Sequence, residues 1–369
     1  MKALIPSILA ASLLLSACSA QPEATTLPTP STTEVTVPEA TQAPTTQPTE
    51  ATVPPTTEAV PVLRHPLNGQ ILEQPLDTRP VAVVINNIRD AQPMLGIGGA
   101  DILFEHVAEG GGIITRMLAI YSSPEQAGVI GSVRSARTYL IDLARNFSAP
   151  IVHCGYSPYA QEDLETTGYP SYNQFFQSRY FYRDSGRLSS GYALEHTMMI
   201  RGEDLAKGLR ESGLDMAAPK TYYGMDFSDT VSLDGASAQT VTVQFYHSYG
   251  KYTVMTYDPA KDVYTGTQKW SGGQMALLDG NTGDAVEFRN VLVLLADTHS
   301  NGYHEFAQLH GEGTGYFACG GKFVPIRWQR PTTADSFTYT LEDGTPIQFA
   351  PGKTYAAILP TQSPAVIFE

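Results

Sequence analysis

Three arginines, Arg116, Arg134 and Arg137, are the residues of this chain best suited to bind an anion. Arg134 and Arg137 flank the start of a predicted helix at Ala136, where the helix dipole disfavours a cation by about 0.3–1 kcal/mol. A guanidinium binds carboxylate or phosphate through two parallel hydrogen bonds, and backbone N–H groups at a helix start assist. These residues therefore indicate a crevice for a phosphate, uronate or carboxylate group of an envelope polymer.

Acidic residues close to these arginines in the sequence keep a second interpretation open. Glu105 and Glu109, with Asp101 nearby, could neutralise the arginines inside the protein. If the segment is helical, Glu105 and Glu109 lie on one face and could act as the carboxyl pair of a glycosidase, which needs one protonated and one ionised group. With arginines nearby both would be ionised, so binding is favoured over hydrolysis.

Polar residues also follow two predicted strands. Asn86 and Asn87 end an apolar run at the position where open α/β sheets bind ligands. His153 ends another predicted strand and could line the crevice, with His196 beside it. Cys154 cannot pair with His153 on a strand, because adjacent side chains point to opposite faces, so Cys154 is expected to be a packed apolar residue.

No metal or cofactor is predicted from the remaining residues. His304 and His310 would lie about 20 Å apart on a strand, and no Cys/His cluster has the spacing of a zinc site. The glycine-rich residues 311–315 lack the order of a phosphate-binding loop. Cys154 and Cys319 could form a disulfide outside the cell, although two free thiols are the favoured interpretation.

The first eighteen residues predict a membrane anchor. Residues 1–17 have the charge at Lys2 and the short apolar run of a signal peptide, and Leu15 to Cys18 match a bacterial lipobox. A diacylglyceryl group on Cys18 would hold the protein at the outer face of the bacterial cytoplasmic membrane. The membrane, into which this lipid inserts, is therefore a predicted partner of the protein.

A tether is predicted for residues 18–62. This segment is rich in Thr, Pro and Glu, and no Lys or Arg occurs between Lys2 and Arg64. It has too little apolar surface to offset the entropy of ordering and should stay disordered. Its proline content favours an extended chain that could reach on the order of 100 Å.

The rest of the chain predicts two domains, an α/β sandwich over residues 63–225 and a β-rich domain over residues 226–369. In the first, residues 81–85 read as a buried strand, residues 100–109 as helix or strand, and residues 136–146 as a helix with Ser135 as N-cap. Further helices are expected near residues 159–165 and 203–211. The second region contains strand-like runs separated by Gly and Asp-Gly turns. They span residues 241–247, 251–258, 291–297, 304–310, 314–320, 322–328, 337–341 and 354–359.

The charge of the chain limits its partners. The formal net charge is −14, which argues against nucleic acid as the main partner. A local basic pocket remains compatible with that value.

Several motifs resemble a known family. The segments RPVAVVINN, ILFEHVAEGGGIITRMLAIY, GSVRSARTYLIDLARNFSAPIVHCGYSP, FYRDSGR, GEGTGYFACGGKFVPIRWQR and PGKTYAAILP are similar to those of YerB-like bacterial lipoproteins, which carry the N- and C-terminal parts of domain of unknown function 3048. The resemblance implies a tethered extracytoplasmic lipoprotein with an N-terminal α/β part and a C-terminal β part, and it implies no catalytic activity.

This chain departs from the family pattern at three places. Asn86-Asn87 replaces an Asp-Asn pair, which makes a metal site at that strand end less favourable. Residues 194–197 keep His196 but replace a Pro-His-Asn sequence, and residues 275–283 replace a His-x-Asp pattern. Any function that depends on those polar pairs would be altered here.

Together the residues predict a lipid-anchored, non-enzymatic envelope protein that binds a wall polymer, another acidic ligand or a protein partner through the arginine crevice. A hydrolase or transferase of envelope glycans or phosphate esters, using Glu105, Glu109 or His153, is the first alternative. A structural interaction module that docks through its β-rich domain is the second.

Overall fold

The computed structural model describes residues 62–109, 114–217, 220–245, 250–361 and 365–369. These residues belong to one compact unit, Val60–Glu369. The predicted signal peptide, Cys18 and the tether up to residue 61 lie outside the described residues.

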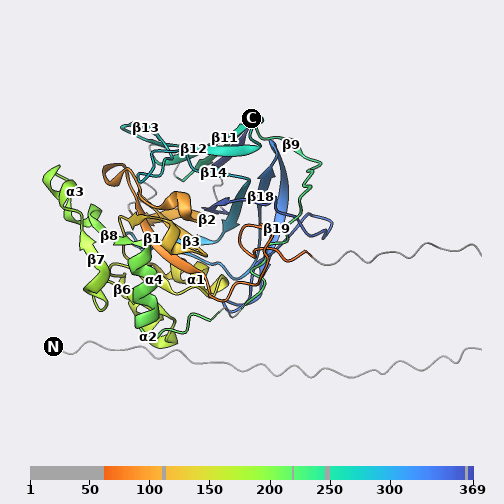
Figure 1. Cartoon of the computed structure of the whole chain (residues 1–369). Coiled ribbons are helices and arrows are strands. Elements are labelled where there is room, and N and C mark those ends of the chain that lie inside the picture. Colours follow the sequence, from red (N-terminus) through yellow and green to blue (C-terminus); the bar gives the residue numbers. More distant parts are fainter. Residues whose placement is uncertain (1–61, 110–113, 218–219, 246–249, 362–364) are drawn as a thin grey trace, which may run out of the picture. The chain divides into compact units, whose positions relative to one another are not determined.

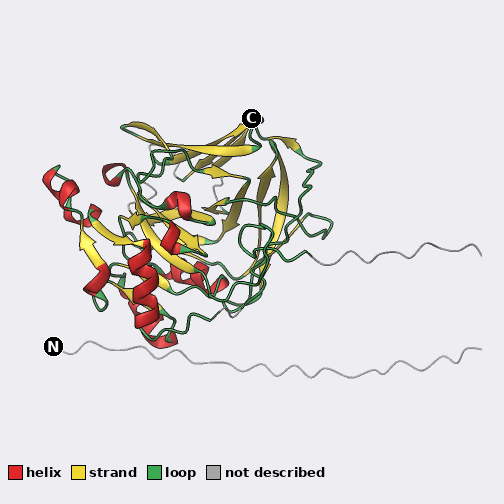
Figure 2. Ribbon diagram, viewed as in Figure 1, coloured by secondary structure: helices red, strands yellow, loops and turns green. Residues whose placement is uncertain are grey.

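Strands are the main regular secondary structure of the described chain, and the helices are few and short (Figure 2). Eleven of the described strands form one mixed sheet that runs through the molecule. Most neighbours are antiparallel, whereas β21 is parallel to both β2 and β15, and β5 is parallel to β1 and β6. The order is β20 (Thr338–Thr340), β19 (Lys322–Arg330), β18 (Gly311–Cys319), β15 (Asn290–Ala296), β21 (Thr354–Pro360), β2 (Ile102–Glu109), β3 (Ile114–Tyr121), β1 (Val81–Asn87), β5 (Ile151–His153) and β6 (Ser171–Asn173), with β9 (Ala236–Ser237) on β19.

Smaller sheets and four described α-helices complete the fold (Figure 1). A second sheet has the order β13 (Gly273–Ala276), β12 (Val263–Trp270), β11 (Tyr252–Asp258), β10 (Thr240–Gln244) and β22 (Ala365–Phe368), with β14 (Glu287–Phe288) on β12. A third consists of β4 (Val129–Gly131), β8 (Met198–Arg201) and β7 (Phe181–Arg183), and β16 (Thr298–Ser300) pairs with β17 (Glu305–Ala307). The helices are α1 (Thr138–Asn146), α2 (Pro158–Thr167), α3 (Ser185–Ser189) and α4 (Gly202–Glu211).

Both faces of the central strands of the large sheet are buried. On one face Val83, Leu103 and Tyr355 join a core that includes Val241 and Met255 of the second sheet. The opposite face carries a second core, in which Val84, Phe104 and Ile358 pack with Tyr139 and Leu140 of α1. Continuous apolar strands such as β1 and β15 are the sequence pattern expected for a sheet covered on both sides.

The sequence located most elements but not their arrangement. The described α-helices all lie before residue 225, and residues 226–369 consist of strands and loops where they are described. The ambiguous residues 100–109 contain strand β2. Strands from both predicted regions share the large sheet, which periodicity alone could not show. The boundary at residue 225 stays a prediction.

The predicted start of the first helix is wrong. Helix α1 begins at Thr138, and its N-cap is Arg137, whose side chain makes no capping bond. Ser135 cannot cap the helix because its hydroxyl donates instead to the carbonyl of Cys154, 3.0 Å away.

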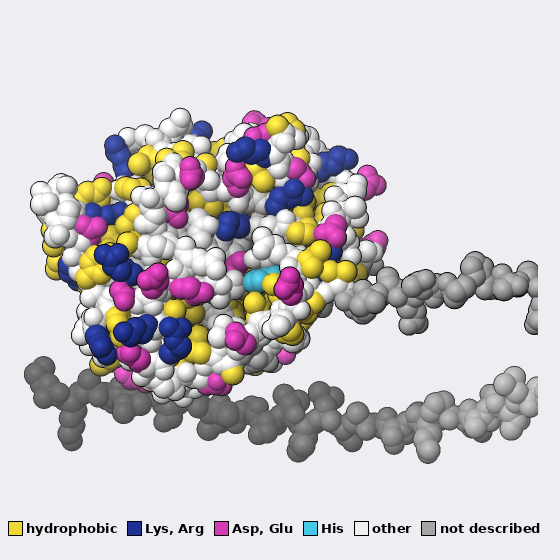
Figure 3. All heavy atoms as spheres, in the orientation of Figure 1, with side chains coloured by type: hydrophobic (Ala, Val, Ile, Leu, Met, Phe, Trp, Pro, Cys, Tyr) yellow, Lys and Arg dark blue, Asp and Glu magenta, His cyan; other side chains and the backbone are white. Residues whose placement is uncertain are grey.

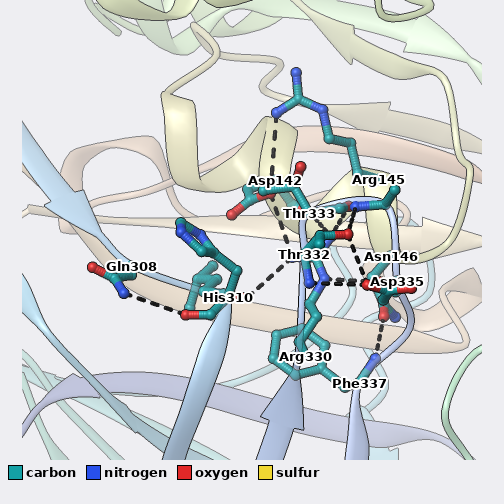
Figure 4. Close-up of polar contacts among 12 residues, drawn as sticks. Asp142, Arg145, Asn146, Gln308, His310, Arg330, Thr332, Thr333, Asp335 and Phe337 are labelled. Carbon is teal, nitrogen blue, oxygen red and sulfur yellow. Dashed lines mark hydrogen bonds and ion pairs between the residues drawn. The ribbon is translucent and has the colours of Figure 1, made fainter.

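Arg330 fixes α1 to the C-terminal part of the chain. Its side chain is fully buried and donates from Nη2 to the carbonyl of Asp142 on α1 (3.0 Å), from Nη1 to that of Leu309 (3.2 Å) and from Nε to that of Asp335 (2.9 Å) (Figure 4). Arg330 also lies 3.4 Å from the carboxylate of Asp142. Several carbonyls and one acid thus compensate a charge that would be costly to bury alone.

Candidate functional site

Arg116 and Arg137 share one carboxylate inside the protein, that of Glu109. Arg116 Nη2 donates to Glu109 Oε1 over 2.7 Å, and Arg137 Nη2 donates to the same oxygen. The side chains of Arg116 and Arg137 are 1% and 6% exposed, and that of Glu109 is 14% exposed. Their remaining Nη1 groups donate to the carbonyls of Ser135 and Ala136. Burial lowers the pKa of both arginines.

A β-bulge sets the direction of the Glu109 side chain. The pairing of β2 with β3 shifts between Val107 and Glu109, which leaves Ala108 without a partner. Without this extra residue, Glu109 would share a face with Glu105, because side chains alternate along a strand. With it, Glu109 turns to the face of α1 and reaches Arg137, while Glu105 stays on the opposite face. The carboxyl pair required by the glycosidase interpretation is therefore not formed.

Arg134 differs from the other two arginines. Its backbone is hydrogen-bonded to Val84 and Cys154, but within the described residues its side chain makes no hydrogen bond and no ion pair, and its Nε atom is buried without a partner. Burial, and to a smaller extent the neighbouring Arg116, lower its pKa to about 10, although Glu195 acts in the opposite direction. Arg134 is thus protonated at neutral pH and available for an anion.

Arg134 lines a cavity of about 360 Å³. Arg183 and Glu195 share this wall, and Phe175 and Leu194 form an apolar rim that is 63% and 58% exposed. Arg183 is occupied, because Nη1 donates to the carbonyl of Leu194. On the face of the molecule seen in Figure 3, basic and acidic side chains are interspersed and form no large basic area. The arrangement can bind one acidic group on a partly apolar ligand.

Glu105 holds the two main sheets together and is not part of this cavity. It is fully buried and accepts bonds from Asn87, Thr115, Lys251, Thr253 and Tyr355. The donors come from β1, β3, β11 and β21 and from the residue before β11. Five donors on one carboxylate indicate a structural ion pair with Lys251 rather than a catalytic acid.

The other predicted site residues are buried, and their side chains are hydrogen-bonded within the protein. The Asn86 amide lies 2.8 Å from His196 Nδ1, and Asn87 contacts Glu105 and Thr115. His153 Nδ1 lies 2.7 Å from the carbonyl of Gly155, and burial lowers the pKa of His153 to about 4. The ring is therefore neutral at pH 7 and holds the end of β5 in place, outside the residues that line the cavity.

The two described cysteines are free. Burial raises the pKa of Cys154 and raises that of Cys319 to about 11. Neither thiol is therefore activated as a nucleophile. Cys154 nevertheless lines the Arg134 cavity, which the sequence did not predict.

Further residues near the arginines also went unpredicted. Tyr303, 62% exposed in the turn between β16 and β17, is close enough to Arg116, Arg134 and Arg137 to oppose slightly the lowering of their pKa values by burial. The turn rests on α2, where Asn301 Nδ2 donates to the hydroxyl of Tyr159 over 3.0 Å. The available signals were the Asn-Gly turn before Tyr303 and, for Phe175, the polar neighbours in SYNQFFQS.

Among the described residues, no helix is long and apolar enough to cross a bilayer. In the same residues, no group of three or more His, Cys, Asp or Glu side chains is arranged to hold a metal ion.

The fold and the cavity define a class of protein, a mixed-sheet sandwich in which Arg134, without a side-chain partner among the described residues, lines a small cavity. Residues 67–215 match the model of "Protein of unknown function (DUF3048) N-terminal domain", and residues 241–356 match the corresponding C-terminal domain. The chain belongs to the DUF3048 family. The resemblance inferred from the motifs is therefore confirmed.

A curated relative and a solved structure support this membership. The chain is 28% identical over 311 residues to "Putative lipoprotein YerB" of Bacillus subtilis (strain 168), covering 83% of this chain and 88% of the relative. The crystal structure of the YerB protein from Bacillus subtilis matches with a TM-score of 0.70 at 27% identity, covering 83% of this chain and 99% of that one. The fold thus extends across both family domains.

Proposed function

We propose that this protein is a lipid-anchored extracytoplasmic protein that binds an acidic group of an envelope polymer or envelope protein beside Arg134. The lipobox ending at Cys18 and the printed name of the Bacillus relative support the anchor and the location. Cys18 would carry the diacylglyceryl group, and the Thr/Pro/Glu-rich segment would hold the folded unit away from the membrane.

The observation that carries the proposal is the unequal pairing of three clustered arginines. Glu109 binds Arg116 and Arg137, whereas Arg134 has no acid partner within the described residues and lines a cavity. A partly buried guanidinium without an acceptor has lost hydration without compensation. An acidic ligand would restore those bonds, and a charge-assisted bond contributes about 1.5–3 kcal/mol.

A titration with anionic wall fragments, followed by calorimetry, tests the proposal. Arg134→Ala should weaken binding at least tenfold, because it removes one charge-assisted contact. Arg210→Ala is the matched control, since it removes an exposed arginine of α4 that does not line the cavity. Equal affinities for wild type and Arg134→Ala would exclude this cavity as the binding site.

A further inference from the structure

Two cavities adjoin at the turn that follows β6. The Arg134 cavity, of about 360 Å³, and a second cavity of about 300 Å³ are both lined by Tyr156. Phe175 lines the first and Phe176 the second. These phenylalanines are 63% and 73% exposed. Adjacent exposed rings beside two neighbouring cavities are typical of an interaction site for an extended ligand.

The turn that carries both rings is fixed by Asn173. Its Oδ1 atom accepts the N–H groups of Gly155 (3.3 Å) and Phe175 (3.2 Å), and its carbonyl accepts that of Phe176 (3.0 Å). Gly155 has a φ of +74°, and a Cβ atom there would lie 3.3 Å from the Phe175 ring. Glycine therefore lets the ring lie against the strand end, and a rigid ring costs little entropy when a ligand binds.

The charges of the first cavity restrict the ligand. Arg134 offers donors to an acid, whereas Glu195 in the same wall is an acceptor. The pKa of Glu195 is lowered, mainly by a bond from its own backbone N–H, so it stays ionised. A simple anion would meet repulsion from Glu195. A ligand that carries both an acid and hydroxyl or amide donors satisfies both residues.

The second cavity has a different chemistry. Gln161, Glu165, Gln177 and the ring of Tyr169 line it, and no lysine or arginine is among its lining residues within the described chain. This wall suits a neutral unit rich in hydroxyl groups. The two walls together fit an acidic unit followed by a neutral one.

We propose that the two cavities are consecutive subsites for an acidic glycan, with a sugar acid between Arg134 and Phe175 and a neutral sugar against Phe176. This inference rests on the proposed function and names its ligand class. The aromatic rings would cover the apolar C–H faces of the sugars, and Glu195 would accept a hydroxyl.

The test uses the full chain and hyaluronan oligosaccharides, in which glucuronate alternates with N-acetylglucosamine. Calorimetry compares the tetrasaccharide with glucuronate, neutral chitotetraose, inorganic phosphate and a tetraglutamate peptide. The tetrasaccharide should bind more tightly than each of the others. Phe175→Leu should weaken both glucuronate and the tetrasaccharide about two- to tenfold, taking a ring–sugar contact to be comparable with a pair of aromatic side chains.

Phe176→Leu gives the sharper readout, because it should weaken the tetrasaccharide by a similar factor and leave glucuronate unchanged. Tyr222→Leu, which removes a 43% exposed ring outside both cavities, is the matched control and should change neither affinity. Both phenylalanines are exposed, so the variants should fold, as thermal melting would verify.

The outcomes separate the two proposals. Arg134-dependent binding of phosphate or glucuronate, with no effect of either phenylalanine substitution, would overturn the glycan inference and leave the anion site standing. Tighter binding of tetraglutamate than of any glycan would overturn it in favour of a peptide. If Arg134→Ala changes the affinity for none of the probes, both the anion site and the glycan inference are overturned.

Discussion

The pairing of Glu109 decides which arginine is free for a ligand. One carboxylate oxygen accepts bonds from two buried guanidinium groups, so the third arginine of the cluster keeps its charge unpaired. Arg134 is therefore left without an acid in the described part of the chain, because Glu109 pairs with the other two arginines of the cluster. The helix N-terminus explains less, because Arg137, the N-cap itself, is one of the paired residues.

Glu109→Gln should consequently destabilise the protein strongly. The amide leaves two arginine side chains, 1% and 6% exposed, without a compensating charge, and breaking a buried ion pair costs about 3–5 kcal/mol. Urea unfolding followed by the fluorescence of the two tryptophans, Trp270 and Trp328, measures the loss. Glu211→Gln, which breaks an exposed pair with Arg179, should change the midpoint little. Similar midpoints for the two variants would contradict the role of Glu109.

At the scale of elements, the Lys251–Glu105 pair joins the second sheet to the large one. Both side chains are 0% exposed, and Lys251 also lies 5.4 Å from the ring centroids of Phe245 and Trp270. Burial lowers the pKa of Lys251, and Glu105 opposes this effect. Glu105 therefore stabilises the charged form of Lys251 in the protein interior.

A double-mutant cycle tests this connection. Glu105→Gln alone should cost about 3–5 kcal/mol of unfolding free energy, because Lys251 is left buried and unpaired. Lys251→Met alone should also destabilise, since the carboxylate then loses its cation. The double variant should be more stable than the sum of the two losses predicts, by about 0.5–3 kcal/mol for contacting residues. Additive losses in urea unfolding would show that the two side chains do not interact.

The sequence predicted the positions of individual strands better than the pairing between strands. The apolar runs at residues 81–85, 291–297 and 354–359 correspond to β1, β15 and β21, because a strand covered on both faces is apolar throughout. The pairing of β21 with β2 could not be predicted, since residues about 250 positions apart meet there and periodicity is local.

The candidate site was predicted only in part for the same reason. The arginine cluster followed from residue type and spacing, but the free member depends on a bulge at Ala108, which exists only in the pairing of β2 with β3. Exposed rings such as Phe175 and Phe176 also look like core residues in a sequence. Their exposure follows from the Asn173 turn, which tertiary contacts define.

At the scale of the folded unit, β21 joins strands of the two family domains into one sheet. This strand from the C-terminal region lies between β2 and β15 and is parallel to both. It fills the centre of the large sheet and supplies Tyr355 to Glu105. A sheet cut at this point would expose two apolar strand edges.

We therefore expect residues 62–225 and 226–369 not to fold as separate fragments. In the first fragment, Glu105 would lose Lys251, Thr253 and Tyr355 and keep only Asn87 and Thr115 as donors. Amide NMR spectra of each fragment should be poorly dispersed, and limited proteolysis should degrade both. As a control, the folded chain cleaved at a protease site inserted after Phe227 should remain associated, because the sheet has already formed. A dispersed spectrum and cooperative unfolding of the first fragment alone would show that the shared sheet is not required for its fold.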